Sequence, residues 1–136
     1  MDSGLVCFLL GIESEAELAR SPFAGSVFEG FVGSEVVKNR HNRGLAGQRY
    51  FFRDEQGLEV GFLTVEAGGG VHLIEAKWAK TIYPQDARSL QRLMAAVKKR
   101  RVEATIVHRP ARTGAALHAV APGVRALTID EFLSAL

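Results

Sequence analysis

The chain has 136 residues, 47% hydrophobic and 24% charged, the composition of a soluble globular protein with one core. The formal net charge of +2 is too small to indicate nucleic-acid binding from bulk electrostatics. The single cysteine excludes an internal disulfide. The apolar run from Leu5 to Leu10 is too short for a membrane helix and lacks the basic flank of a signal peptide. We therefore expect one cytoplasmic domain over residues 1–136, without a membrane partner.

Two short helices and one long helix are predicted at the start of the chain. Asp2 or Ser3 suits the N-cap of an apolar helix that ends near Gly11, and Ser14 suits the N-cap of a second. Residues 1–20 are therefore expected to form a short helical segment. The third and longest helix is predicted over Pro22–Asn42, because proline suits the first helical position and apolar residues recur at three- and four-residue spacings.

After Gly44 the apolar pattern changes to period two, which is typical of strands. Residues 49–53 are predicted to form the first strand. Two further apolar runs within 58–78 are joined by the glycines at 68–70, the clearest hairpin signal in the sequence. These residues together predict a three-stranded meander. Its third strand should be central in the sheet, because its apolar positions do not alternate strongly.

The remaining residues predict a crossover helix, further strands and a closing helix. The helix is expected over Pro84–Arg101, followed by strands at Ala104–His108 and Leu117–Val120. Thr128 and Glu131 have the spacing of a capping box for the closing helix. A meander followed by a helix and a strand allows parallel pairing. The sequence therefore predicts an α/β fold with a mixed central sheet flanked by helices.

A search for catalytic and binding motifs is mostly negative. The sequence has no phosphate-binding loop of the G-x-x-x-x-G-K-[ST] type, so we expect no nucleotide site. The spacing of its four histidines does not suggest a zinc site, and no serine lies in a G-x-S-x-G motif.

Charged residues on a buried-type strand are the exception. Glu75 and Lys77 are two residues apart and face the same side, as do Glu59 and Gly61 on the preceding strand. Taken alone, Glu75 and Lys77 are more simply explained as a solvated or cross-strand ion pair. Glu29, at the edge of an apolar helical stripe, is as readily a half-buried carboxylate bonded to a neighbour as a site residue.

An ordered series of short motifs runs through the whole chain. Its members are Asp2-Ser3-Gly4-Leu5, Leu9-Leu10-Gly11, Gly25-Ser26-Val27-Phe28-Glu29-Gly30-Phe31-Val32, Tyr50-Phe51-Phe52-Arg53-Asp54, Glu59-Val60-Gly61-Phe62-Leu63 and Ile74-Glu75-Ala76-Lys77. With this series the chain resembles the domain of unknown function that closes many prokaryotic AAA-type ATPases, within the PD-(D/E)XK nuclease-like superfamily. In that superfamily a helical glutamate precedes a strand aspartate, and the next strand carries E-x-K.

This resemblance implies a restriction-endonuclease-like fold and a site formed by Glu29, Glu75 and Lys77. It also implies Mg²⁺ as cofactor, held by Glu75 and the family aspartate, but Gly61 occupies the place of that aspartate. Glu59 is the other candidate ligand, although it lies about 6.6 to 6.8 Å along the strand. We therefore expect an incomplete metal site with weak metal binding.

The resemblance also suggests partners. The 136 residues do not include the ATPase module that precedes this domain in the family, so we expect the chain to be either a C-terminal piece or a stand-alone remnant, and residues 1–20 would join that module. DNA is a further candidate partner, with Arg88, Arg92, Lys98 and Lys99 as nucleic-acid-binding residues. The simpler interpretation of the basic run at 98–101 is positive charge at the C-terminus of a helix.

Three functions therefore remain open. The first is a non-catalytic nuclease-like domain that binds nucleic acid or a partner beside an ATPase. The second is a Mg²⁺-dependent DNA endonuclease that uses Glu59, Glu75 and Lys77. The third is a structural domain that forms homo-oligomers, which exposure of Leu5–Leu10 would favour.

Overall fold

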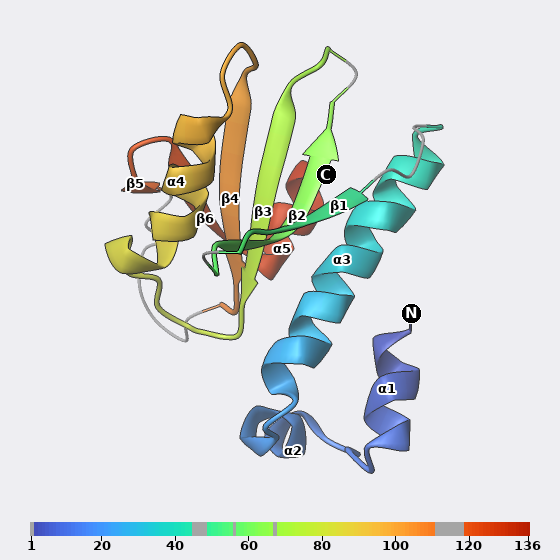
Figure 1. The fold of residues 1–136 in the computed structure, drawn as a ribbon. Helices are drawn as coiled ribbons and strands as arrows, with labels where there is room; N and C mark the ends of the chain where they lie inside the picture. The colour runs from blue at the N-terminus through green and yellow to red at the C-terminus, as the bar shows by residue number, and fades with distance from the viewer. Residues whose placement is uncertain (1, 45–48, 56, 67, 111–118) are drawn as a thin grey trace.

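The computed structural model describes residues 2–44, 49–55, 57–66, 68–110 and 119–136, and within them six strands form one mixed sheet. The strand order is β1-β2-β3-β4-β6-β5. Helices α3 and α5 lie on one face of this sheet and α4 lies on the other (Figure 1). The predicted α/β class, with a mixed sheet flanked by helices, is confirmed.

The first two helices begin at the caps that the sequence predicts. Helix α1 (Ser3–Leu9) starts where Asp2 Oδ1 accepts a hydrogen bond of 2.7 Å from the Gly4 amide. Helix α2 (Glu15–Arg20) starts where Ser14 Oγ accepts from the Glu17 amide at 3.2 Å. No helix in the described part of the chain combines the length and the apolar character needed to cross a bilayer.

Helix α3 (Ala24–Asn42) is the longest helix and starts two residues later than predicted. Ser21 Oγ accepts a hydrogen bond from the Phe23 amide, which closes a turn before the helix instead of capping it. The apolar side of α3 packs on the sheet through Phe28, Val32 and Val36.

The central part of the chain has the predicted order. Strands β1 (Arg49–Arg53), β2 (Glu59–Val65) and β3 (Val71–Lys77) form an antiparallel meander. A 3-10 turn, η1 (Pro84–Ala87), and helix α4 (Arg88–Ala96) then lead to β4 (Val102–His108). Strand β4 pairs in parallel with the whole of β3, so β3 lies inside the sheet as predicted.

The prediction for the crossover helix was wrong at its end. Helix α4 ends at Ala96 because Val97 is extended and Lys99 adopts a positive φ of 69°. The basic residues at 98–101 therefore form the connection to β4 and are not the last turn of a helix.

The last strand pair was only partly foreseen. Strand β6 (Val124–Thr128), which was not predicted, lies between β4 and β5 (Ala119–Ala121). Residues 117 and 118 of the predicted strand lie outside the described residues. Helix α5 (Ile129–Ala135) begins at Thr128, whose Oγ1 accepts from the Glu131 amide and whose own amide donates to the Glu131 carboxylate, which confirms the capping box.

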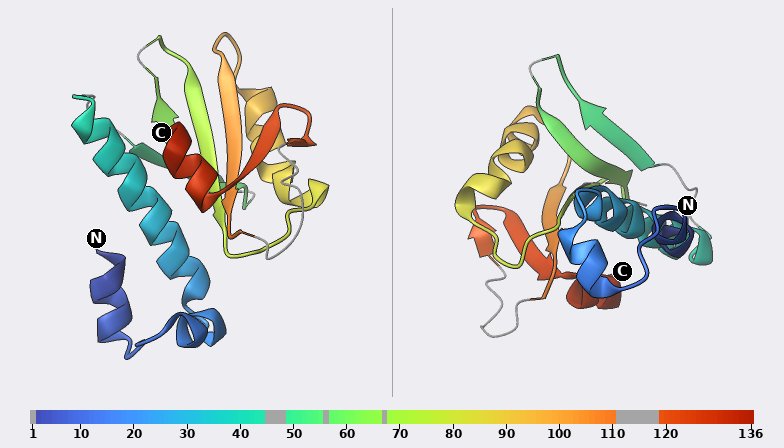
Figure 2. Two further views of the ribbon diagram at one scale, coloured as in Figure 1. Left: turned by 180° about the vertical axis from the view of Figure 1, so that it is seen from behind. Right: turned by 90° about the horizontal axis from the view of Figure 1, so that it is seen from below.

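Apolar side chains cover both faces of the central strands. Leu73 and Ile106 pack towards α4, together with Leu90 of that helix. Ile74 and Val107 belong to the cluster on the other face, with residues of α3 and α5. Figure 2 shows α3 and α5 on the same side of the sheet. Any charged side chain of β3 is therefore placed inside or at the border of a covered sheet.

Candidate carboxylate site

The sheet opens between β2 and β3 at the glycine that replaces the expected aspartate. The last pair between these strands joins Phe62 to Ile74, and beyond it β2 pairs only with β1. Just beyond this pair, the Gly61 amide donates a hydrogen bond of 3.1 Å to Glu75 Oε2 of β3. The Glu75 side chain thus links β2 to β3 at the point where the pairing of the two strands ends.

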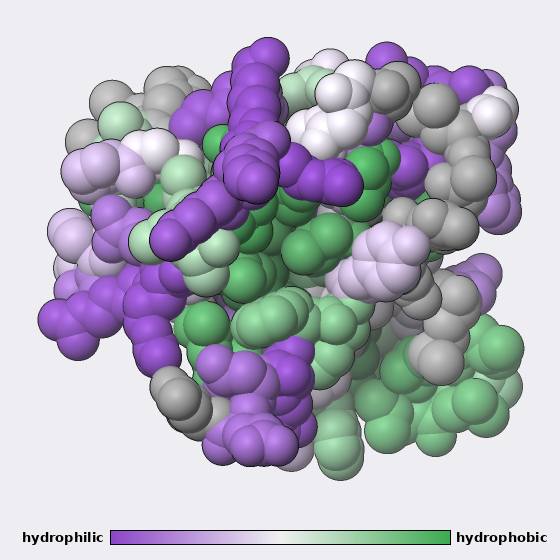
Figure 3. Space-filling view, turned by 45° about the horizontal axis from the view of Figure 1, so that its top comes forward, coloured by the Kyte–Doolittle hydropathy of each residue, from purple (hydrophilic) through white to green (hydrophobic). Residues whose placement is uncertain are grey.

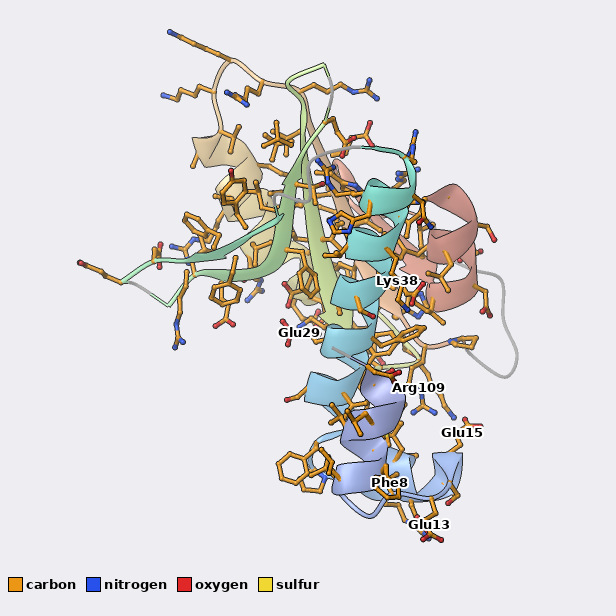
Figure 4. The ribbon with its side chains drawn as sticks, turned by 90° about the vertical axis from the view of Figure 1, so that its right-hand side faces the viewer. Phe8, Glu13, Glu15, Glu29, Lys38 and Arg109 are labelled. Carbon is orange, nitrogen blue, oxygen red and sulfur yellow. The ribbon has the colours of Figure 1, made fainter. Side chains whose placement is uncertain are left out.

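Glu29 approaches the same point from α3. A Cβ added at Gly61 would lie 3.2 Å from Glu29 Oε1 and 3.9 Å from Glu75 Oε2. Figure 4 shows Glu29 on the side of α3 that faces the strands. The structure therefore brings together three positions that the sequence singled out, namely Glu29, Gly61 and Glu75.

Burial makes both carboxylates harder to ionise. Desolvation raises the pKa of Glu75 above its ordinary value, and the charges of Glu29 and Glu59 add to this, whereas the Gly61 amide and the Lys77 ammonium oppose it. Desolvation also raises the pKa of Glu29, with a further contribution from Glu59. The two carboxyl groups are therefore more readily protonated than exposed ones.

The other two predicted site residues have partners of their own. Lys77 Nζ lies 3.5 Å from Asp86 Oδ1 of η1, and Glu59 Oε2 lies 3.8 Å from Arg53 Nε at an exposed position. Asp86 also accepts a hydrogen bond of 2.8 Å from the Tyr83 amide, which fixes its position at the start of η1. Sequence reasoning missed Asp86, although an acidic residue after a proline at a helix start is a recognisable capping signal.

The residues present do not fit a Mg²⁺ site. Mg²⁺ requires near-octahedral oxygen coordination, usually with one or two carboxylates and several other oxygens. Here Gly61 supplies no side-chain oxygen, one oxygen of Glu75 accepts a backbone amide, and Glu59 faces Arg53. Within the described ranges no group of three or more His, Cys, Asp or Glu side chains is arranged to hold a metal ion.

A cleft of about 790 Å³ opens beside Glu29 and Gly61. Its walls come from the first residues of the chain, α3 and the β1–β2 edge, and they include Tyr50 and Phe51. These two aromatic residues are 48% and 55% exposed, so the lining of the cleft includes large apolar groups in contact with solvent. Sequence reasoning placed both in a strand but did not assign them to the site.

The candidate nucleic-acid-binding residues lie apart from this cleft. Arg88 and Arg92 are exposed on α4, and Lys98 and Lys99 are exposed in the connection to β4. Because Val102 pairs with Val71, this connection lies at the end of β3 opposite Lys77. Seven residues of strand separate the two ends by about 20 Å. Lys98 and Lys99 therefore do not share one basic face with Lys77.

The fold and the site together define a mixed α/β protein with a half-buried carboxylate pair at the opening of its sheet. The chain belongs to the family called domain of unknown function DUF4143, whose model matches residues 24–129. The match extends from the first residue of α3 to the first residue of α5. No curated protein matches the chain.

Proposed function

We propose that this chain is a nuclease-like accessory domain of an AAA-type ATPase family protein, with a restriction-endonuclease-like fold and a site that no longer cleaves. In this proposal it acts in the cytoplasm as a nucleic-acid-binding or interaction module. The order of Glu29 on a helix, Gly61 on a strand and Glu75 with Lys77 on the next strand supports the nuclease-like origin.

The position of residue 61 is the observation that carries the proposal. A side chain there would start within 4 Å of the carboxylates of both Glu29 and Glu75, where a nuclease of this class places its aspartate. Glycine leaves two carboxylates of raised pKa without the third oxygen donor. Such a pair binds a divalent cation poorly, because protonation competes with the metal and too few oxygens converge.

The test compares the parent with Gly61→Asp and with Gly61→Asn, its uncharged isostere. We expect Mg²⁺ to raise the melting temperature of Gly61→Asp alone, because only this variant adds a carboxylate beside Glu29 and Glu75. Without metal, Gly61→Asp should melt below Gly61→Asn, because a third negative charge repels the other two. A metal-induced shift in the parent equal to that of Gly61→Asp would contradict an incomplete site.

Plasmid nicking distinguishes the proposal from the endonuclease alternative. We expect no Mg²⁺-dependent nicking by the parent. Nicking by the parent that Glu75→Ala abolishes would instead support an active endonuclease that uses Glu59, Glu75 and Lys77.

DNA is the nucleic acid that we expect this module to bind. Exposed basic residues contact phosphates without reading sequence, and such binding weakens steeply with salt. Replacing Lys98 and Lys99 by glutamine should weaken binding of a fluorescent duplex, whereas replacing the exposed Arg20, on α2, should not. Equal losses of DNA affinity in the two variants would show that any exposed positive charge supports binding, and that Lys98 and Lys99 are not a specific site.

A further inference from the structure

A second cavity, of about 430 Å³, lies on the face of the sheet that α3 and α5 cover. It is near the start of β3, at Val71 and His72, whereas Glu75 lies towards the other end of that strand. Among the described residues, its lining shares none with the cleft beside Glu29. Its size is within the range of sites that hold small molecules, about 300–1,000 Å³.

The sheet register gathers polar side chains at the base of this cavity. Thr64 pairs with His72 and His72 with Glu103, and Thr105 pairs with Arg125. Paired residues of neighbouring strands project on the same face, so these groups form two adjacent polar rows. His72 Nε2 lies 2.9 Å from Thr105 Oγ1, and both threonines are buried. Hydroxyl, imidazole and charged groups thus lie together at one end of a face that elsewhere packs apolar side chains against α3 and α5.

The charged residues of the lining leave an excess of positive charge. Arg101 and Arg125 share one carboxylate, Glu103, and the Arg125 Nη2 to Glu103 Oε2 distance is 4.0 Å. Arg40 is largely buried, with a side-chain exposure of 11%, and its Nη2 donates to the Val65 carbonyl at 2.9 Å. Among the described residues, the lining contains four arginines and two glutamates, and Arg43 Nη1 also donates to the main-chain oxygen of Leu136 at 2.9 Å: the charged side chains are Arg40, Arg43, Arg101 and Arg125 against Glu66 and Glu103.

The histidine of the lining does not add to this charge. Burial lowers the pKa of His72, although nearby Glu103 and Glu66 oppose the effect, so its imidazole is neutral at physiological pH. A neutral imidazole can accept or donate a hydrogen bond to a ligand without changing the balance of charge.

Apolar side chains complete the lining. Val36 of α3, Ile74 of β3, Leu127 of β6 and Phe132 of α5 all border the cavity. A ligand that fits this combination needs an anionic group for the arginines and an apolar body for these four side chains.

We propose that this cavity binds a small phosphomonoester that carries an apolar body. A phosphomonoester has a charge of about −1.5 to −2 near neutral pH and three acceptor oxygens, so it can bind two guanidinium groups of the lining at once better than a carboxylate of −1 does. Guanidinium groups bind phosphate through two parallel hydrogen bonds, and Arg101 and Arg125 lie close enough to one carboxylate to act on one anion. The proposal does not depend on the state of the Glu29–Glu75 pair.

Calorimetric titration with phenyl phosphate tests the proposal, with phenol and inorganic phosphate as the two halves of the probe. We expect phenyl phosphate to bind more tightly than either half. The exposed Arg125→Gln and Arg101→Gln should each weaken binding by about tenfold, the loss expected for one charge-assisted hydrogen bond. Because both side chains are exposed, these variants should fold normally, which a thermal melt verifies.

Arg92→Gln is the matched control, because Arg92 is an exposed arginine on α4, on the other face of the sheet. It should leave the affinity unchanged, and so should Glu75→Gln, which separates this cavity from the carboxylate site. Absence of phenyl phosphate binding by the parent would overturn the proposal. So would phenol binding as tightly as phenyl phosphate, or an equal loss of affinity in Arg92→Gln.

Discussion

Glu75 accepts the Gly61 amide while burial holds its pKa above the ordinary value of 4.5. Between 4.5 and the raised pKa, the folded chain binds more protons than the unfolded chain, so the free energy of unfolding falls as pH rises through this window. We predict that Glu75→Gln removes this pH-dependent loss of stability. The glutamine side chain stays uncharged at every pH, and its oxygen can still accept the hydrogen bond from the Gly61 amide. The variant should therefore gain stability relative to the parent at neutral pH but not near pH 4.5.

Denaturant unfolding of both proteins over a pH series measures this difference. Glu55→Gln, at an exposed turn position, is the control and should follow the parent at every pH. If the difference in the free energy of unfolding between Glu75→Gln and the parent is the same at every pH, folding does not raise the pKa of Glu75, and the prediction is contradicted.

Part of this site was predictable from the sequence, because the order of its motifs resembles that of the PD-(D/E)XK superfamily. Glu29, Gly61 and Glu75 were singled out from a resemblance, and the structure brings them together. The contact of Lys77 with Asp86 was not predicted, because it depends on how η1 returns to the end of β3. Such contacts arise from tertiary packing between distant segments, which no local pattern encodes.

At the scale of elements, the turn between β5 and β6 depends on one glycine. Gly123 has a φ of 75°, and a Cβ there would lie 2.6 Å from Met94 Cε of α4. We predict that Gly123→Ala lowers the free energy of unfolding by about 1 kcal/mol or more, because left-handed backbone strain adds to the displacement of Met94.

Chemical denaturation measures this change, with Gly30→Ala as the matched control. Gly30 lies inside α3, and a Cβ there meets nothing within 4 Å. The same substitution at Gly30 should stabilise the chain by about 0.5–1 kcal/mol, because alanine favours the helix. Equal effects at the two glycines would contradict the role of the turn conformation.

Helix and strand positions were largely predictable from periodicity, and element ends were not. The meander, the long helix and the parallel β3–β4 pair followed from period-two and three-to-four spacings joined by glycine turns. The end of α4 at Ala96 did not, since the lysines and arginines at 98–101 favour helix formation, whereas the structure has Val97 extended and Lys99 at a positive φ. Strand β6 was not predicted because it is only five residues long and its last residue, Thr128, is also the N-cap of α5.

At the scale of the whole molecule, α1 leaves an apolar surface uncovered. Phe8 and Leu9 are 78% and 74% exposed, and Leu5 is 56% exposed. Figure 3 shows apolar side chains gathered on the surface beside the polar part of the molecule. Exposed apolar patches promote association between protein chains.

We predict that the chain self-associates at high concentration and that Phe8→Ser weakens this association. Sedimentation velocity over a concentration series measures it. Tyr83→Ser is the control, because Tyr83 is an aromatic residue with 54% exposure near η1, away from α1. A chain that stays monomeric at every concentration would contradict the prediction, and so would an equal effect of the two variants.

The unequal pairing of β3 with its two neighbours has a consequence for backbone motion. Seven residue pairs join β3 to β4, whereas four join it to β2. Local opening needs fewest broken bonds where pairing is shortest, so the amides of β1 and of the first half of β2 should exchange their hydrogens with solvent before those of β3, β4 and β6. The Gly61 amide lies at this boundary, and its rate of exchange reports how often Glu75 releases the strand.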